Sequence, residues 1–160
     1  MSIKEFELFH GAVLTKLVRS DRPLTLRMIE TRPGEAWSIY KLNDAVKVLV
    51  KHSRTPRKLK RDRAGASWPF SFSRDQVLQL RSKDAWVALV CGADRVGDAK
   101  MEVCLLKPEE VGQLLDVQSE VQQSVTVKYL PGKRLRVSSA RWDELVVPRN
   151  RVENWEVPGS

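Results

Sequence analysis

Two apolar segments of strand length constrain the fold of this chain more than any other feature. Residues 84–92 (DAWVALVCG) form a short, nearly continuous apolar run, which is typical of a central strand that is buried on both faces. Residues 45–53 (AVKVLVKHS) form a second, valine-rich candidate. A chain of 160 residues can bury a core around such strands without disulfides or metals, so we expect a single folded α/β unit.

Apolar spacing and turn residues predict the other elements. Residues 3–20 carry apolar side chains three and four positions apart, which predicts a helix. Residues 24–31 and 36–42 form a three-stranded meander with 45–53, joined by a tight turn at Asn43-Asp44, because both residues tolerate left-handed φ. The remaining predictions are a helix over 74–81 capped by Ser73, a strand over 101–106, a helix from Pro108 to Leu115, and a hairpin of 125–129 with 134–138.

Positive charge is concentrated in the N-terminal part of the chain. The formal net charge is +8, and residues 1–63 account for all of it, with 15 basic residues against 7 acidic ones. The density is highest in 51–63 (KHSRTPRKLKRDR), which predicts an acidic polymer as partner. The alternative is a solvated loop without a ligand. The aromatic segment 68–72 (WPFSF) follows, and we expect Trp68 and Phe70 to anchor in the core, with stacking on an unpaired base as the alternative.

The order helix, three-stranded meander, helix, strand, together with Val48-Leu49-Val50-Lys51-His52-Ser53, resembles the PD-(D/E)XK, or restriction-endonuclease-like, superfamily. In that family a hydrophobic strand ends in a lysine that is followed by a small hydroxyl residue. The resemblance covers about residues 3–107. It implies an αβββαβ core in residues 1–117 with a basic loop at 54–67, and it leaves 118–160 as a C-terminal β-hairpin extension packed on the same domain.

The resemblance also implies a site that hydrolyses phosphodiesters with Mg²⁺ held by carboxylates. Lys51 takes the position of the family's lysine, but Leu49 stands where a metal-binding acid is expected two residues earlier. Ala36 faces Lys51 if Asn43-Asp44 form a two-residue turn, whereas Glu35 does so if the loop spans Leu42 to Asp44. An active site would therefore use Lys51, Glu35 and Glu7, with Glu7 and Glu35 as the metal ligands.

The histidines and cysteines predict little further chemistry. His10 lies one turn from Glu7 and either faces the site or belongs to the helix surface. His52 alternates to the face opposite Lys51, which argues against a joint site. Cys91 and Cys104 lie in apolar strands, where thiols are usually inert, and this pattern suits a reducing cytoplasm.

We therefore expect a nucleic-acid-associated protein, prokaryotic and cytoplasmic, with a degenerate catalytic site and no cofactor. It would bind nucleic acid, DNA rather than RNA, through the side chains of Arg54, Arg57, Lys58, Lys60, Arg61 and Arg63. One alternative is an active Mg²⁺-dependent endonuclease, and another is a protein-interaction or adaptor subunit. No membrane span is expected, and a strand edge in 118–160 would allow a homodimer.

Overall fold

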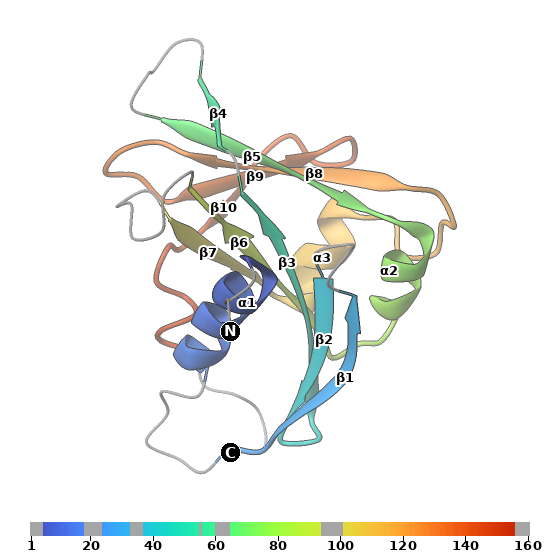
Figure 1. Cartoon of the computed structure of the whole chain (residues 1–160). Coiled ribbons are helices and arrows are strands. Elements are labelled where there is room, and N and C mark those ends of the chain that lie inside the picture. The colour runs from blue at the N-terminus through green and yellow to red at the C-terminus, as the bar shows by residue number, and fades with distance from the viewer. Residues whose placement is uncertain are drawn as a thin grey trace.

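The computed structural model describes residues 5–17, 24–32, 37–54, 56–59, 65–93 and 101–155 of the chain. These residues form a mixed α/β structure of two sheets and three helices (Figure 1). In chain order the elements are α1 (Glu5–Leu17), β1 (Leu26–Arg32), β2 (Trp37–Leu42), β3 (Val46–Ser53), β4 (Arg57–Lys58), β5 (Ala66–Phe72), α2 (Arg74–Gln79), β6 (Ala85–Cys91), β7 (Glu102–Leu106), α3 (Pro108–Leu114), β8 (Gln123–Tyr129), β9 (Leu135–Ser139) and β10 (Leu145–Val147).

The first sheet, sheet A, has the strand order β1-β2-β3-β6-β7. Strands β1, β2 and β3 form the expected antiparallel meander, and β6 and β7 are also antiparallel to each other. Strands β3 and β6 are parallel, from Lys47 opposite Ala85 to Ser53 opposite Cys91. The chain therefore leaves β3 at one end of the sheet and must return to the other end before β6 begins.

The second sheet, sheet B, is antiparallel throughout and has the order β10-β9-β8-β5-β4. Strand β5 pairs with β8 over its whole length, from Ala66 opposite Tyr129 to Phe72 opposite Gln123. The C-terminal hairpin of β8 and β9 is thus joined by hydrogen bonds to a strand that lies between β3 and β6 in sequence.

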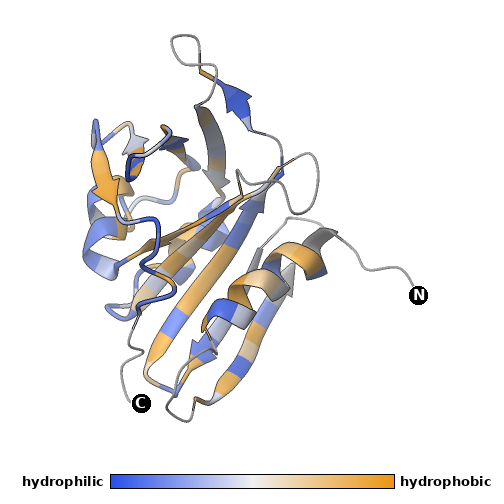
Figure 2. Ribbon diagram, turned by 90° about the vertical axis from the view of Figure 1, so that its left-hand side faces the viewer, coloured by the Kyte–Doolittle hydropathy of each residue, from blue (hydrophilic) through white to orange (hydrophobic). Residues whose placement is uncertain are grey.

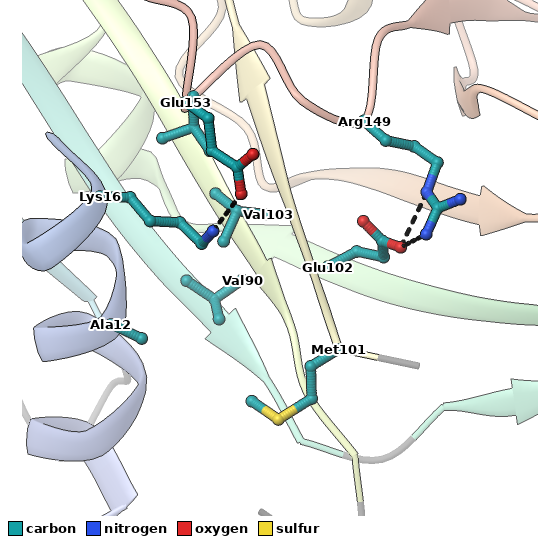
Figure 3. A pocket seen from close by; sticks show the side chains of 9 residues that line it. Ala12, Lys16, Val90, Met101, Glu102, Val103, Arg149 and Glu153 are labelled. Carbon is teal, nitrogen blue, oxygen red and sulfur yellow. Dashed lines mark hydrogen bonds and ion pairs between the residues drawn. The ribbon is translucent and has the colours of Figure 1, made fainter. Parts of the chain in front are cut away.

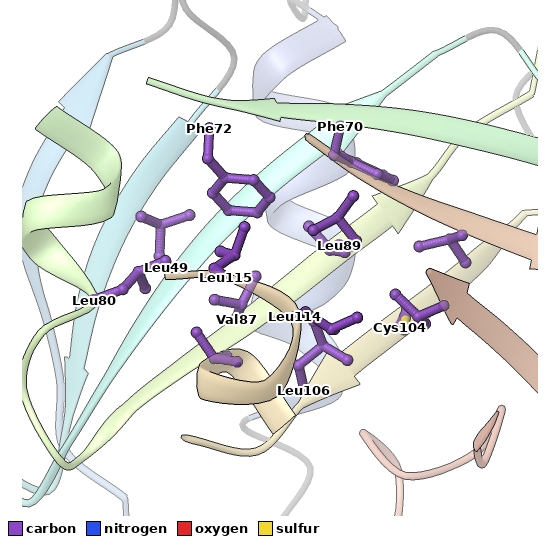
Figure 4. Packing of buried hydrophobic residues seen from close by; sticks show 14 of the residues in the cluster. Leu49, Phe70, Phe72, Leu80, Val87, Leu89, Cys104, Leu106, Leu114 and Leu115 are labelled. Atoms are coloured by element: carbon purple, nitrogen blue, oxygen red, sulfur yellow. The ribbon is translucent and has the colours of Figure 1, made fainter. Parts of the chain in front are cut away.

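Each face of sheet A is covered by a different layer. Helix α1 covers one face, where its residues Phe9 and Val13 pack among valines of the central strands. Sheet B, α2 and α3 cover the other face, and the side chains between the two sheets form the larger core (Figure 4). Hydrophobic residues follow the central strands along their length, as Figure 2 shows.

The β2–β3 turn differs from both predicted registers. Asn43 and Asp44 adopt the expected left-handed conformation, with φ of 53° and 50°. The loop nevertheless has three residues, because Leu42 pairs with Val46, and Lys51 therefore lies opposite Trp37. Trp37 thus takes the place predicted for Ala36 or Glu35, which lie outside the described residues. The physical reason is the anchoring of Asn43, which accepts a hydrogen bond from Thr25 N at 2.8 Å and donates its own N–H to Thr25 O at 2.9 Å.

The helix termini agree with the capping predictions. Ser73 caps α2, and its side chain accepts a hydrogen bond from Gln76 N while Gln76 Oε1 accepts one from Ser73 N. Pro108 begins α3. In the described part of the chain, no helix is both long enough and apolar enough to cross a membrane.

Two glycines provide a matched test of this packing. A Cβ on Gly92, just after β6, would lie 2.8 Å from Cζ of the buried Phe9 and 3.0 Å from Ser53 O, whereas a Cβ on Gly112 in α3 would meet nothing within 4 Å. We expect Gly92→Ala to lower the free energy of unfolding by about 1–3 kcal/mol through overpacking. We expect Gly112→Ala to raise it by about 0.5–1 kcal/mol, because alanine is the better helix former. Urea denaturation measures both, and equal effects of the two substitutions would contradict this packing.

Candidate functional site

The end of strand β3 carries two polar clusters on opposite faces of sheet A. Lys51 points between the two sheets, and its neighbour His52 points toward α1. The two clusters share no residue, as the alternation of side chains along a strand predicted.

Lys51 is almost completely buried, with 6% of its surface exposed. Its Nζ donates hydrogen bonds to Ser71 O at 2.5 Å and to Gln76 Oε1 at 2.6 Å, and lies 5.1 Å from the centre of the Phe72 ring. The ammonium group therefore joins β3 of sheet A to β5 of sheet B and to the first turn of α2. Both oxygens are neutral, so dipoles and a ring face are among the groups that stabilise this buried positive charge.

Apolar side chains occupy the position two residues before Lys51 and the position opposite that one on β2. Leu49, two residues before Lys51, is 1% exposed and packs with Phe72 and Val87 in the core between the sheets (Figure 4). Ile39, opposite Leu49 on β2, is fully buried and apolar as well. Within the described ranges, no group of three His, Cys, Asp or Glu side chains could hold a metal ion. Glu30 of β1, which lies opposite Ile39, brings one partly buried carboxylate to this face at the edge of sheet A.

The second cluster links α1 to the two strands beneath it. His10 Nδ1 lies 2.6 Å from Ser38 Oγ, and His10 Nε2 lies 3.0 Å from His52 Nδ1. His10 and Ser38 are 1% and 0% exposed, and the ring of Phe9 packs 5.1 Å from that of His52. These are the only two histidines of the sequence. Sequence reasoning placed them separately, because the contact joins residues 42 positions apart.

One arrangement of protons satisfies both contacts of this cluster. With the Ser38 hydroxyl donating to His10 Nδ1, the Nε2–H of His10 donates to His52 Nδ1. The cluster is therefore a structural link under α1, and Ser38 is too deeply buried to act as a nucleophile toward an outside substrate.

The structure places two of the predicted catalytic residues, Glu7 and Lys51, on opposite faces of sheet A. Glu7 is an exposed residue of α1, which covers the face of sheet A opposite to Lys51. Glu35 lies outside the described residues. Sheet A therefore lies between Glu7 and Lys51.

Three of the six predicted nucleic-acid-binding residues are described, and all three are exposed. Arg54 follows β3 directly, and Arg57 and Lys58 form β4 at the edge of sheet B. The remaining three, Lys60, Arg61 and Arg63, lie outside the described residues.

The aromatic residues predicted as core anchors are buried. Trp68 is completely buried and donates its indole N–H to Gly92 O at 2.8 Å, and Phe70 is 3% exposed. Neither ring is available for stacking on a base.

The cysteines lie in the core between the sheets. Burial raises the pKa of the Cys91 thiol, and the neighbouring Cys104 and Glu102 add to this effect. Burial also raises the pKa of Cys104, with Glu110 as the next contribution. Both thiols therefore remain protonated and unreactive at neutral pH.

A pocket of about 290 Å³ lies between α1, β6, β7 and the C-terminal segment (Figure 3). It contains two ion pairs, Lys16 with Glu153 and Arg149 with Glu102. The hydrogen bond to Glu102 raises the pKa of Arg149, so its guanidinium stays charged at neutral pH. None of the predicted site residues that the structure describes lines this pocket.

Comparisons with protein-family models, with curated proteins and with solved structures find no match to this chain. The function must therefore be inferred from the site and its surface.

The Lys51 cluster makes a graded prediction for stability. Gln76→Leu removes an acceptor from a buried ammonium and breaks the α2 capping box, so we expect a loss of about 3 kcal/mol in the free energy of unfolding. Lys51→Met removes the charge itself and should cost only about 1–2 kcal/mol. The double variant should be more stable than Gln76→Leu alone. Ser73→Ala measures the cap by itself, at about 1 kcal/mol, and a strictly additive double variant would disprove the coupling.

The histidine cluster predicts a similar dependence on Ser38. Ser38→Ala leaves a buried imidazole nitrogen of His10 without its hydroxyl, which should lower the free energy of unfolding by about 1–3 kcal/mol. Ser124→Ala is the matched control, because Ser124 is exposed on β8 and should change stability by less than about 0.5 kcal/mol. Equal unfolding midpoints of the two variants in urea would show that the buried hydrogen bond contributes nothing.

Proposed function

We propose that this protein binds nucleic acid through the basic segment 54–63 and that its PD-(D/E)XK-like core has a degenerate catalytic site. The observation that carries the proposal is Leu49, which is buried and apolar at the position two residues before Lys51. Lys51 itself stands at the end of a hydrophobic strand and donates hydrogen bonds to Gln76 and to a main-chain carbonyl.

The order of elements supports the family part of the proposal. A helix, an antiparallel meander, a crossover with a helix, and a strand parallel to the third strand follow each other along the chain. The family's order αβββαβ is the same, with β4 and β5 inserted in the crossover of this chain. Lys51 thus occupies the place of a catalytic lysine, and its hydrogen bonds connect sheet A to sheet B and α2.

Loss of catalysis follows from the chemistry of the cation. Mg²⁺ is held by carboxylates together with phosphate oxygens, and it activates the water that attacks the phosphodiester. Leu49, two residues before Lys51, and Ile39, opposite Leu49 on β2, supply hydrocarbon on this face. A binding function needs none of this chemistry, because phosphate contacts require only charge and reach.

The distribution of charge supports nucleic acid as the partner. The net charge of +8 belongs entirely to residues 1–63, and Arg54, Arg57 and Lys58 are exposed directly after β3. Figure 2 shows β4 as a hydrophilic strand at the rim of the molecule.

We infer DNA rather than RNA as the partner. We also infer the prokaryotic cytoplasm as the compartment, because the buried, protonated thiols suit reducing conditions. Strand β10 lies at an edge of sheet B with Val146 48% exposed, which supports a homodimer as a further part of the proposal.

Binding of a fluorescent DNA duplex, followed by anisotropy over a series of salt concentrations, tests the proposal. We expect the affinity to fall steeply as salt rises, because each neutralised phosphate releases counterions. Replacing Arg57, Lys58, Lys60 and Arg61 with alanine should abolish binding. Incubation with plasmid and Mg²⁺ or Mn²⁺ should leave the DNA intact.

Each alternative has its own outcome in these assays. Cleavage that disappears in Lys51→Ala would show an active nuclease and would contradict the degenerate site. No binding at low salt, together with a stable complex in a pull-down, would favour an adaptor subunit. Lys51→Met, which keeps all the exposed cations, should bind DNA as the unmodified chain does.

A further inference from the structure

The solvent-facing side of sheet B, called here the outer face, carries positive charge that the linear sequence does not reveal. Side chains alternate along its strands, and Trp68, Val127 and Val137 face the core. The residues between them point outward. They are Arg57 on β4, Ser67, Pro69 and Ser71 on β5, Ser124, Thr126 and Lys128 on β8, Arg136 and Ser138 on β9, and Val146 on β10.

The strand register aligns three cations of the outer face in one row. Arg57 lies opposite Ser67, Ser67 opposite Lys128, and Lys128 opposite Arg136. Arg57 and Lys128 are exposed, and the side chain of Arg136 is 34% exposed. Arg136 forms an ion pair with Glu144 at 2.7 Å through Nη1, and a guanidinium group carries further N–H donors besides that one. Residues from β4, β8 and β9 thus present one basic strip.

The rest of the outer face is small and hydroxyl-rich. A second row of opposed residues contains Pro69, Thr126 and Ser138, and a third contains Ser71 and Ser124. None of the outward residues named above is acidic, and none is aromatic. The face therefore offers cations and hydroxyl donors to phosphate oxygens, and no ring on which an unpaired base would stack.

We propose that the outer face of sheet B is a second binding surface, which contacts the sugar–phosphate backbone of double-stranded nucleic acid without reading its bases. This proposal rests on the proposed function and extends it from the basic segment to β8 and β9. Arg57 belongs to both surfaces, because it lies in the basic segment and at one end of the cationic row.

The dimensions of the row favour a duplex over a single strand. Strands lie about 4.8 Å apart, so the row from β4 to β9 spans about 14 Å. That length is close to the width of a major groove, about 12 Å, so cations at its two ends can reach phosphates on the two strands that border the groove. A single strand would have to supply its affinity by stacking, for which the outer face has no ring.

The test compares two double variants of equal charge. Lys128→Gln/Arg136→Gln removes two cations of the outer face, and Lys83→Gln/Lys107→Gln removes two exposed cations from outside sheet B. Circular dichroism and thermal unfolding check that both fold. Anisotropy with a DNA duplex, and with one of its strands, is measured over a salt series.

We expect the outer-face variant to bind the duplex on the order of tenfold more weakly near 0.1 M salt, with a slope of log affinity against log salt that is smaller by about 1–2. The control variant should lose no more than about threefold through its reduced net charge. The unmodified chain should prefer the duplex to the single strand.

Three results would overturn the proposal. If the two double variants bind the duplex equally, the outer face is not a binding surface, while the proposed function stands on the basic segment. If the single strand binds as tightly as the duplex, the double-stranded assignment is wrong. If the unmodified chain binds neither, the proposed function fails and the outer face fails with it.

Discussion

The parallel pairing of β3 with β6 is the constraint on which the rest of the structure depends. Parallel neighbours need a long crossover connection, and here residues 54–84 supply it. This crossover contains α2 and also β4 and β5, and β5 becomes the strand to which the C-terminal hairpin attaches. Sheet B therefore begins inside the connection of sheet A. The two sheets then bury the aromatic side chains of β5 against Leu49 and Leu89 of the central strands (Figure 4).

Lys51 shows what this arrangement demands of a polar residue. Strand β3 is covered on both faces, so its last residues must find partners inside the protein. Lys51 meets Ser71 O and Gln76 Oε1, and Gln76 also accepts from Ser73 N at the start of α2. One side chain thus connects the two sheets to the helix cap. His52 makes the corresponding connection to α1 through His10 on the other face. Hydrogen bonds therefore hold the end of β3 on both faces of sheet A.

Local sequence patterns predicted most elements, and the failures have identifiable causes. The alternation of Ala66, Trp68, Phe70 and Phe72 with smaller outward residues is the signal of a half-buried strand, but Pro69 concealed it. Pro69 is tolerated because β4 pairs with β5 only at Ser67 and Ala66, so that in the described chain the remaining part of that edge has no strand neighbour.

The candidate site was predictable in part. The alternation of Lys51 and His52 followed from the period of a strand, and Leu49 as a non-ligand followed from its chemistry. The β2–β3 register did not follow, because it is set by the contact of Asn43 with Thr25, which directly precedes β1. The pairing of His10 with His52 also depends on how α1 crosses the sheet, which no local pattern contains.

The placement of charge on the surface also depends on strand pairing, which the sequence alone does not show. Residues 64–160 contain 13 basic and 13 acidic residues, so a count along the chain assigns them no preference for an anion. Antiparallel pairing nevertheless selects every second residue for the outer face, and on β8 and β9 this selection retains Lys128 and Arg136. Strand β4 adds Arg57 to the same row through β5. Net charge is a property of a segment, whereas binding depends on a surface. Residues 64–160 have no net charge, but the register of β4, β5, β8 and β9 places two of their cations beside Arg57 on one basic surface.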